Sequence, residues 1–270
     1  MSLEAFFDRH GKVIHVRQTD VRGSAPREAG AEMFVALTAT YGTIGGGQLE
    51  YMAIDQARAM LRQGRASTQM NVPLGPEIGQ CCGGRVVLHL TQLSAAETVA
   101  ACARETADHC AYRQVYILGA GHVGRALAQL FQHLPVRCCL VDTRAEELAL
   151  SDAAVDKRCT ALPEAEIRQA PAGSAFIVLT HDHALDFLLT SEALARPDAA
   201  YVGLIGSATK RAKFETYCRT STPEVSTNAL ICPIGAGHST DKRPHVIASF
   251  VVAEVMARLT EPQLNTKITA

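Results

Sequence analysis

One segment constrains the fold of this chain more than any other: an apolar run that ends in three spaced glycines. The run covers residues 115–118 and reads as a buried strand. It is followed at once by Gly119, Gly121 and Gly124, and then by a helical pattern of apolar residues. In such a strand–turn–helix, the first glycine permits a tight turn, the second lets backbone approach a phosphate, and the third lets the helix pack on the strand. The spacing therefore predicts a Rossmann-type nucleotide-binding unit.

The sequence that follows extends the same pattern. A second apolar run, residues 136–141, ends at Asp142, at the distance where an acidic residue would meet a ribose hydroxyl. The runs at residues 175–179 and 201–205 are apolar without interruption and alternate with helical segments. Strands that are covered on both faces of a parallel sheet have this composition. We therefore expect a parallel sheet with crossover helices.

The first third of the chain has a different organisation. Shorter strand-like runs and one helical pattern, at residues 48–63, predict a small α+β domain. The fold class is α/β, a C-terminal Rossmann-like parallel-sheet domain preceded by a smaller α+β domain. The predicted divisions are an N-terminal domain at 1–92, a connecting helix at 93–112, the Rossmann-like domain at 113–262 and a flexible tail at 263–270.

Composition limits the class of protein. The net charge is -1, which indicates neither a nucleic-acid partner nor an anionic membrane surface. No apolar run is long enough to span a bilayer, and the start of the chain lacks a signal-peptide pattern, so we expect a cytoplasmic protein. The nine cysteines are an odd number, which favours buried or reactive thiols over a disulfide framework.

Polar residues follow the predicted parallel strands, at the edge where open α/β sheets bind ligands. His122 lies inside the glycine turn, and His181, Asp182 and His183 come after the run at 175–179. They could orient a bound ligand, coordinate a metal, or be solvated loop residues. Their spacing matches no fixed metal-ligand pattern, so hydrogen bonding to a ligand is favoured over a metal.

A third loop after a predicted strand carries Gly206, Ser207 and Lys210. Backbone amides, a hydroxyl and a cation at a helix start suit an anion or a phosphate. Ser207 is equally a good N-cap for a helix with an exposed basic face, and the sequence leaves both readings open.

The predicted N-terminal domain has a glycine loop of its own. Gly45, Gly46 and Gly47 precede a helix, and so many glycines cost enough backbone entropy to favour close approach of backbone to a ligand. Glu50 would lie in the first turn of that helix, either as a partner of the helix dipole or as a reader of donor groups on a ligand.

A second loop of this domain holds vicinal thiols. Cys81 and Cys82 precede Gly83 in a glycine-rich stretch, and Arg85 could favour a thiolate. Soft sulfur ligands suit molybdenum, copper, zinc or sulfur transfer. Two cysteines without a second pair disfavour a closed zinc site.

Taken together, these motifs resemble the XdhC/CoxI family of xanthine dehydrogenase accessory proteins, which insert the molybdenum cofactor. They occur in the family's order and cover nearly the whole chain. The motifs that carry the resemblance are Gly-Ser-Ala-Pro at 23–26 with Gly30, the segment 44–50, the segment 80–84, the glycine turn 119–124, Thr180-His-Asp-His183, the segment 203–207 with Lys210, and Cys232-Pro-Ile-Gly235.

The resemblance implies a non-catalytic chaperone that binds molybdenum cofactor (molybdopterin), shields it and hands it to a xanthine dehydrogenase-type apo-enzyme. It also implies a cysteine desulfurase as a partner that supplies the terminal sulfur, and a homodimer. On this basis we expect the cofactor between the two domains, with Cys81 or Cys82 facing molybdenum. Its phosphate would lie at the 119–124 turn or at the 207–210 loop.

Two other functions remain open at this stage. The glycine fingerprint and Asp142 are typical of an NAD(P)-dependent oxidoreductase, with the nucleotide in the Rossmann unit. Alternatively, Cys81 or Cys82 could carry a persulfide, which would make the chain a component of a sulfurtransferase.

Overall fold

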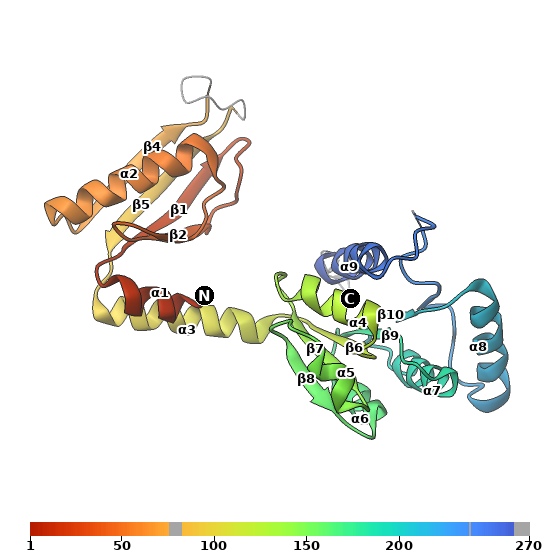
Figure 1. The fold of residues 1–270 in the computed structure, drawn as a ribbon. Helices are drawn as coiled ribbons and strands as arrows, with labels where there is room; N and C mark the ends of the chain where they lie inside the picture. Colours follow the sequence, from red (N-terminus) through yellow and green to blue (C-terminus); the bar gives the residue numbers. More distant parts are fainter. Residues whose placement is uncertain (76–82, 238, 262–270) are drawn as a thin grey trace, which may run out of the picture. The chain divides into compact units, whose positions relative to one another are not determined.

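A computed structural model describes residues 1–75, 83–237 and 239–261 (Figure 1). The chain forms two compact units, Met1–Asp108 and His109–Ala270, which we describe separately. The units divide within a helix, whereas the sequence placed its domain boundaries at the two ends of that helix; those boundaries remain a proposal. The predicted flexible tail lies outside the described residues.

The first unit contains a five-stranded antiparallel sheet in the order β3-β2-β1-β5-β4. Its elements, in chain order, are α1 (Leu3–His10), β1 (Ile14–Arg22), β2 (Glu32–Val35), β3 (Thr40–Gly42), α2 (Gly47–Gln63), β4 (Ser67–Pro73), β5 (Arg85–Gln92) and α3 (Ala95–Ala111).

Alternation along the strands decides how this unit packs. In β1, Ile14 and Val16 are fully buried, and they share a core with Leu49 and Met60 of α2. The helix repeats its buried positions every three or four residues, which places them on the one face that meets the sheet. A second cluster, which includes Phe6 of α1, packs around residues of β2 and α3.

The second unit contains a six-stranded sheet in the order β11-β10-β9-β6-β7-β8, and all its strand pairs are parallel. This is the strand order of the dinucleotide-binding Rossmann fold. Its elements are β6 (Gln114–Leu118), α4 (His122–Phe131), β7 (Arg137–Asp142), α5 (Ala145–Ala149), β8 (Asp156–Cys159), α6 (Pro163–Gln169), β9 (Ala175–Val178), α7 (His183–Leu194), β10 (Tyr201–Leu204), α8 (Ala208–Ser221), β11 (Leu230–Ile231) and α9 (Pro244–Thr260).

Helices cover both faces of this sheet. Alternate residues of β6 point to opposite sides: Ile117 packs in a core with α4 and α9, and Leu118 packs in a core with α6, α7 and α8. Because both faces are buried, strands β6, β9 and β10 carry no charged residue, and the one polar side chain in them is Gln114 at the start of β6 apart from the hydroxyls of Tyr116 and Tyr201. Strand order reverses between β6 and β9, so the carboxyl ends of these strands open a crevice for ligands.

The fold class predicted from the sequence is confirmed: a parallel, Rossmann-like sheet follows a smaller α+β unit. The sequence did not identify several short or polar elements, among them β4, β8, α5 and α6. Within the described ranges, no helix is both long and apolar enough to cross a bilayer.

Candidate functional site

The glycine turn between β6 and α4 is fixed by two of its three glycines. A Cβ atom on Gly124 would lie 1.9 Å from the Gly119 carbonyl oxygen, and one on Gly119 would lie 2.4 Å from the Leu179 carbonyl oxygen. No side chain fits at either position. By contrast, a Cβ on Gly121 would meet nothing within 4 Å. Gly119 and Gly124 therefore shape the turn, and Gly121 keeps the backbone open on its outer side.

Helix α4 presents an uncapped N-terminus at this turn. Its N-cap is Gly121, which has no side chain to accept a hydrogen bond, and its first turn contains no acidic residue. The first amides of the helix therefore face outward with the positive end of the helix dipole. Arg125 lies on the next turn, where its Nη1 donates to the Ala120 carbonyl and to Glu147, both at 2.7 Å. This end of α4 is suited to an anion.

Asp142, which ends β7, holds the glycine turn from the neighbouring strand. Its Oδ2 accepts a hydrogen bond from the Ala120 amide at 2.7 Å. Arg144 donates to the same carboxylate from its amide, its Nε and its Nη2, at 3.0, 3.0 and 3.2 Å. A carboxylate has about four lone-pair sites, and these four donors occupy them. Asp142 is therefore a clamp on the turn and has no acceptor site left for a ribose hydroxyl.

The charge of Asp142 follows from these contacts. Burial raises the pKa of its carboxyl group, but the hydrogen bonds from Arg144 and from the Ala120 amide outweigh burial and hold the pKa below its ordinary value. Asp142 is consequently ionised at neutral pH. Its side chain and the Arg144 guanidinium form an ion pair that is buried on the aspartate side.

A second buried carboxylate holds the loop after β9. Asp186 is fully buried in α7, and its Oδ1 accepts hydrogen bonds from the Thr180 amide and hydroxyl, both at 2.8 Å. Its Oδ2 pairs with the Lys210 ammonium, which comes from α8. Lys210 thus joins two of the loops at the carboxyl edge, and its charge is committed to Asp186.

Helices α7 and α8, which also start at this edge, are capped by side chains of their own N-cap residues. Asp182 caps α7 by accepting from the amides of Ala184 and Leu185, at 2.7 and 3.4 Å. Ser207 caps α8 by accepting from the Lys210 amide at 3.3 Å. Among α4, α7 and α8, which follow the central strands β6, β9 and β10, only α4 leaves its first amides without a side-chain acceptor. The geometry therefore favours the 119–124 turn over the 207–210 loop as the anion site.

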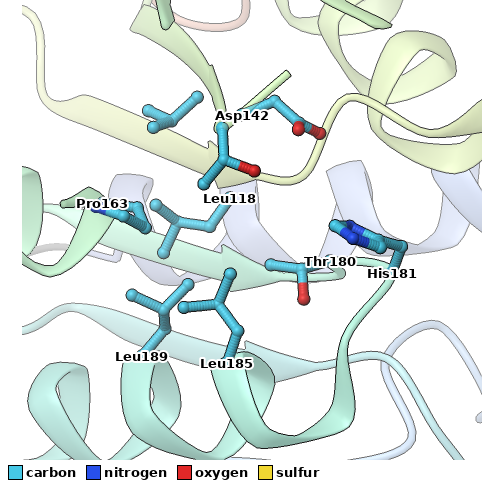
Figure 2. Close-up of a pocket in the computed structure, with 9 residues that line it drawn as sticks. Leu118, Asp142, Pro163, Thr180, His181, Leu185 and Leu189 are labelled. Atoms are coloured by element: carbon cyan, nitrogen blue, oxygen red, sulfur yellow. The ribbon is translucent and has the colours of Figure 1, made fainter. Parts of the chain in front are cut away.

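A narrow, mostly apolar slot opens beside these loops (Figure 2). In Figure 2, Leu185 and Leu189 extend from α7 toward Leu118, while Thr180 and His181 lie at the other end. The enclosed space is about 10 Å³, which holds about one water molecule. A bicyclic ring does not fit into this slot without movement of its side chains.

In the first unit, Glu50 clamps the other glycine loop. Its Oε2 accepts from the Thr43 hydroxyl at 2.5 Å and from the amides of Ile44 and Gly46 at 2.9 and 3.1 Å. Burial raises the pKa of Glu50, but these hydrogen bonds outweigh it and the pKa is lowered. The sequence placed Glu50 in the first turn of α2, as a partner of the helix dipole or as a reader of a ligand. The structure places it in that turn, and its hydrogen bonds are to the loop at residues 43–46.

Three loops of the first unit that are distant in sequence lie against one another. A Cβ on Gly84 would lie 2.2 Å from the Ser24 carbonyl oxygen, and Ser24 forms a β-bridge with Gly83. A Cβ on Gly45 would lie 2.6 Å from Cβ of Pro26. The loop at residues 23–27 therefore contacts both the 45–47 loop and the residues that follow the cysteine pair. Cys81 and Cys82 lie outside the described residues.

Comparison with known protein families identifies the family of this chain. Residues 7–71 match the XdhC and CoxI family, and residues 115–255, just over half of the 270 residues, match the XdhC Rossmann domain. The chain belongs to the XdhC family. The resemblance inferred from its motifs is thereby confirmed.

One solved structure supports the fold of this XdhC-family protein. A protein from Bacillus halodurans, described as a xanthine dehydrogenase, superposes with a TM-score of 0.80 at 15% identity, over 99% of this chain and 98% of that one. The NAD(P)-binding domain of an exopolyphosphatase-related protein from Archaeoglobus fulgidus gives a TM-score of 0.35 at 18% identity, over 44% of this chain and 86% of that one. The first match supports the fold alone, and the second is too distant to support an argument. No curated protein matches the chain.

The structure places the three candidate histidines of this XdhC-family chain at the crevice, on separate loops and helix starts. His122 begins α4, His183 begins α7, and His181 lies between β9 and α7; all three are exposed. In the described part of the chain, no group of three or more His, Cys, Asp or Glu side chains is placed to hold a metal ion. Gly206, the remaining candidate, lies directly before the α8 cap.

Sequence reasoning missed the roles of Arg144 and Asp186. Arg144 follows Asp142 by two residues, a spacing that could have suggested a local ion pair. Asp186 stands in the first turn of α7, but nothing in the sequence indicates that Lys210, 24 residues later, would reach it.

Proposed function

We propose that this protein is an accessory protein of a xanthine dehydrogenase-type molybdenum hydroxylase. It binds molybdenum cofactor, protects it, supports its sulfuration by a cysteine desulfurase, and delivers it to the apo-enzyme. Membership of the XdhC and CoxI family supports this proposal most directly. The observation that supports cofactor binding is the open N-terminus of α4 beside a turn that Asp142 holds in place.

The residues present suit the phosphate end of the cofactor. Molybdopterin carries a phosphate, and the uncapped amides at Gly121 and His122 are the groups at this edge best able to bind one. Gly121 leaves room for close approach, since a Cβ there would meet nothing within 4 Å. Lys210 does not take this role, because Asp186 already holds its charge.

The cysteine pair belongs to the same proposal. Cys81 or Cys82 would contact the molybdenum through a soft thiolate, and the bound cofactor would supply the metal centre that the target enzyme needs. Gly45, Gly46 and Gly83 would line the approach to these thiols from the neighbouring loops of the first unit. A homodimer and a cytoplasmic location complete the proposal.

A nicotinamide-dependent oxidoreductase is the second candidate, and the strand order with its glycine fingerprint favours it. The bonding of Asp142 counts against it, since all four acceptor sites of that carboxylate are used. We expect no change in NADH or NADPH fluorescence when purified protein is titrated with either nucleotide. Tight binding together with reduction of a carbonyl substrate would favour this candidate instead.

The proposed function is tested by native mass spectrometry of the full chain co-expressed with the cofactor pathway. We expect the wild type to carry the mass of molybdenum cofactor, and Gly121→Ala to retain roughly tenfold less, because a methyl group there obstructs the phosphate. His122→Ala tests the exposed first residue of α4, and His133→Ala, just beyond the other end of α4, is its matched control. A wild type without cofactor would overturn the function, whereas full retention by Gly121→Ala would overturn only the phosphate assignment.

The cysteines need a separate measurement. We expect Cys81→Ala with Cys82→Ala to reduce both cofactor retention and activation of the target dehydrogenase. Unchanged values for both would remove the cysteines from the proposal. If protein purified with the desulfurase instead gains the mass of one sulfur atom on either cysteine, the sulfurtransferase reading is correct for that residue.

A further inference from the structure

A second hollow lies at the amino edge of the parallel sheet, away from the glycine turn. Its lining includes Arg113 just before β6, Tyr201 at the start of β10, Leu230 at the start of β11, and Arg258 near the end of α9. All these residues belong to the second unit. The hollow measures about 520 Å³, which is within the usual range for small-molecule sites.

Arg113 contributes an unpaired positive charge to this hollow. Its guanidinium carries five N–H donors, and no acceptor among the described residues bonds to it, although the residue is partly buried. The turn at Gly173 leaves space for it, because a Cβ there would lie 2.8 Å from Nη1 of Arg113. In the part of the chain that the structure describes, no acidic side chain forms an ion pair with this guanidinium.

Arg258 brings a second positive charge from another element. In the described chain its ion-pair partner is Glu261, with 3.6 Å between Nη1 and Oε1, and the two side chains are 54% and 62% exposed. Exposed pairs of this kind contribute little. Two arginines and one glutamate leave the hollow with a net positive charge, and the arginine fork is suited to bidentate binding of a phosphate or carboxylate.

The remaining walls limit the kind of anion. Ile231 and Ala200, both partly buried, add apolar surface beside the arginines, and Leu230 is 4% exposed behind them. The Tyr201 hydroxyl is not available, since it donates to Glu254 at 2.9 Å. A ligand that uses the whole space would thus combine an anionic group with a compact apolar body.

We propose that this amino-edge hollow is a second binding site, which takes a small organic phosphate or carboxylate and holds the anionic group between Arg113 and Arg258. The site goes beyond the proposed function and does not depend on it, because it shares no residue with the carboxyl edge. Ligand binding at the two edges can therefore be measured independently.

The test is isothermal titration calorimetry on the full chain with phenyl phosphate, benzoate, inorganic phosphate and benzyl alcohol. We expect phenyl phosphate or benzoate to bind one per chain, more tightly than inorganic phosphate, with no heat from benzyl alcohol. The phosphate and carboxylate probes distinguish the two anion chemistries. Arg113→Gln and Arg258→Gln should each weaken binding roughly tenfold, since each removes a charge-assisted hydrogen-bond donor group.

Matched variants separate this site from the glycine turn. Arg219→Gln, an exposed arginine of α8, and Gly121→Ala should both bind the probes like the wild type. If Arg113→Gln does not fold, Arg113→Lys and Arg258→Gln carry the same test. Wild-type affinity in the Arg113 and Arg258 variants, or no binding of either organic probe at about 10 mM, would overturn the second site. Loss of binding in Gly121→Ala alone would place the anion at the glycine turn, which also overturns this site and leaves the proposed function intact.

Discussion

The two glycine-rich loops of this protein are each held by a carboxylate, but from very different positions. Glu50 holds the 45–47 loop from the start of the helix that this loop precedes, and it is only partly buried. Asp142 holds the 119–124 turn from a neighbouring strand, is 6% exposed, and is itself fixed by Arg144. The contacts of Glu50 are local in sequence and accessible to water. The contact of Asp142 with the glycine turn forms only when the strands of the parallel sheet are paired.

The same contrast applies to the whole carboxyl edge of the parallel sheet. Asp186 is fully buried and ties Thr180 to Lys210, so the loop after β9 is also held by groups from other elements. We infer that the loops of the second unit are preorganised for a ligand. The loop held by Glu50 can be released at a much smaller cost in free energy.

The largest expected effect comes from Gly124. In Gly124→Ala the new Cβ would stand 1.9 Å from the Gly119 carbonyl oxygen, a backbone atom that cannot move without breaking the turn. We expect the free energy of unfolding to fall by about 4 kcal/mol or more, measured by chemical denaturation. Gly121→Ala is the matched control and should cost less than about 1 kcal/mol. Equal losses in the two variants would show that the turn is not shaped as described.

The buried ion pair gives the next largest effect. Lys210→Met leaves the Asp186 charge buried without its cation, and we expect a loss of about 3 kcal/mol in the free energy of unfolding. Lys213→Met, an exposed lysine of the same helix, should be close to neutral. Adding Asp186→Leu to Lys210→Met should recover part of the loss, because the unpaired charge is then removed. Identical stability of Lys210→Met and Lys213→Met would contradict the pairing.

Asp142→Asn tests the long-range clamp and should cost about 2 kcal/mol, since it weakens the bond from Ala120 and removes the closer of the two ion pairs of Arg144. The folded pKa of Asp142 is lowered, so its contribution is present above the ordinary aspartate pKa of about 4 and is lost as the pH falls through the folded value. The difference between wild type and variant, followed by denaturation, should therefore shrink at acidic pH. A difference that stays constant down to pH of about 2 would exclude the carboxylate as its source.

Much of this architecture could be predicted from the sequence alone, because the spacing of apolar residues along a strand or helix follows from which of its faces is buried. The apolar run at 115–118 and the spaced glycines are sufficient to predict β6, the turn and α4, although the steric reason for Gly119 is the Leu179 carbonyl of another strand end. Strand β8 was missed because its residues are polar and largely exposed, so its sequence lacks an apolar run. A strand at the edge of a sheet needs less apolar surface than a central one.

The predicted site depended on contacts that sequence spacing does not encode. Lys210 was expected to be available to a phosphate, and its actual partner is fixed only when α7 and α8 pack together. Asp142 was expected to meet a ribose, and the amide of Ala120 takes that oxygen once β6 and β7 pair. The residue types were informative, but their partners follow from the tertiary fold.

The smallest predicted effect belongs to the local clamp. Glu50→Gln keeps the shape of the side chain and removes its charge, so the bonds from Thr43 and from the loop amides weaken without being lost. Because water reaches this carboxylate, we expect a cost of only about 0.5 to 1 kcal/mol, with Glu28→Gln on the same unit as a neutral control.

Hydrogen exchange tests the same variant where the stability change is too small to interpret. The amides of Ile44 and Gly46 should lose protection in Glu50→Gln, while the strands of the first unit keep theirs. The lowered pKa of Glu50 means that acid should reproduce this local opening in the wild type as the pH falls through the folded value. If these two amides instead exchange together with the strands, the loop is as firmly held as the glycine turn of the second unit, and the contrast between the two clamps disappears.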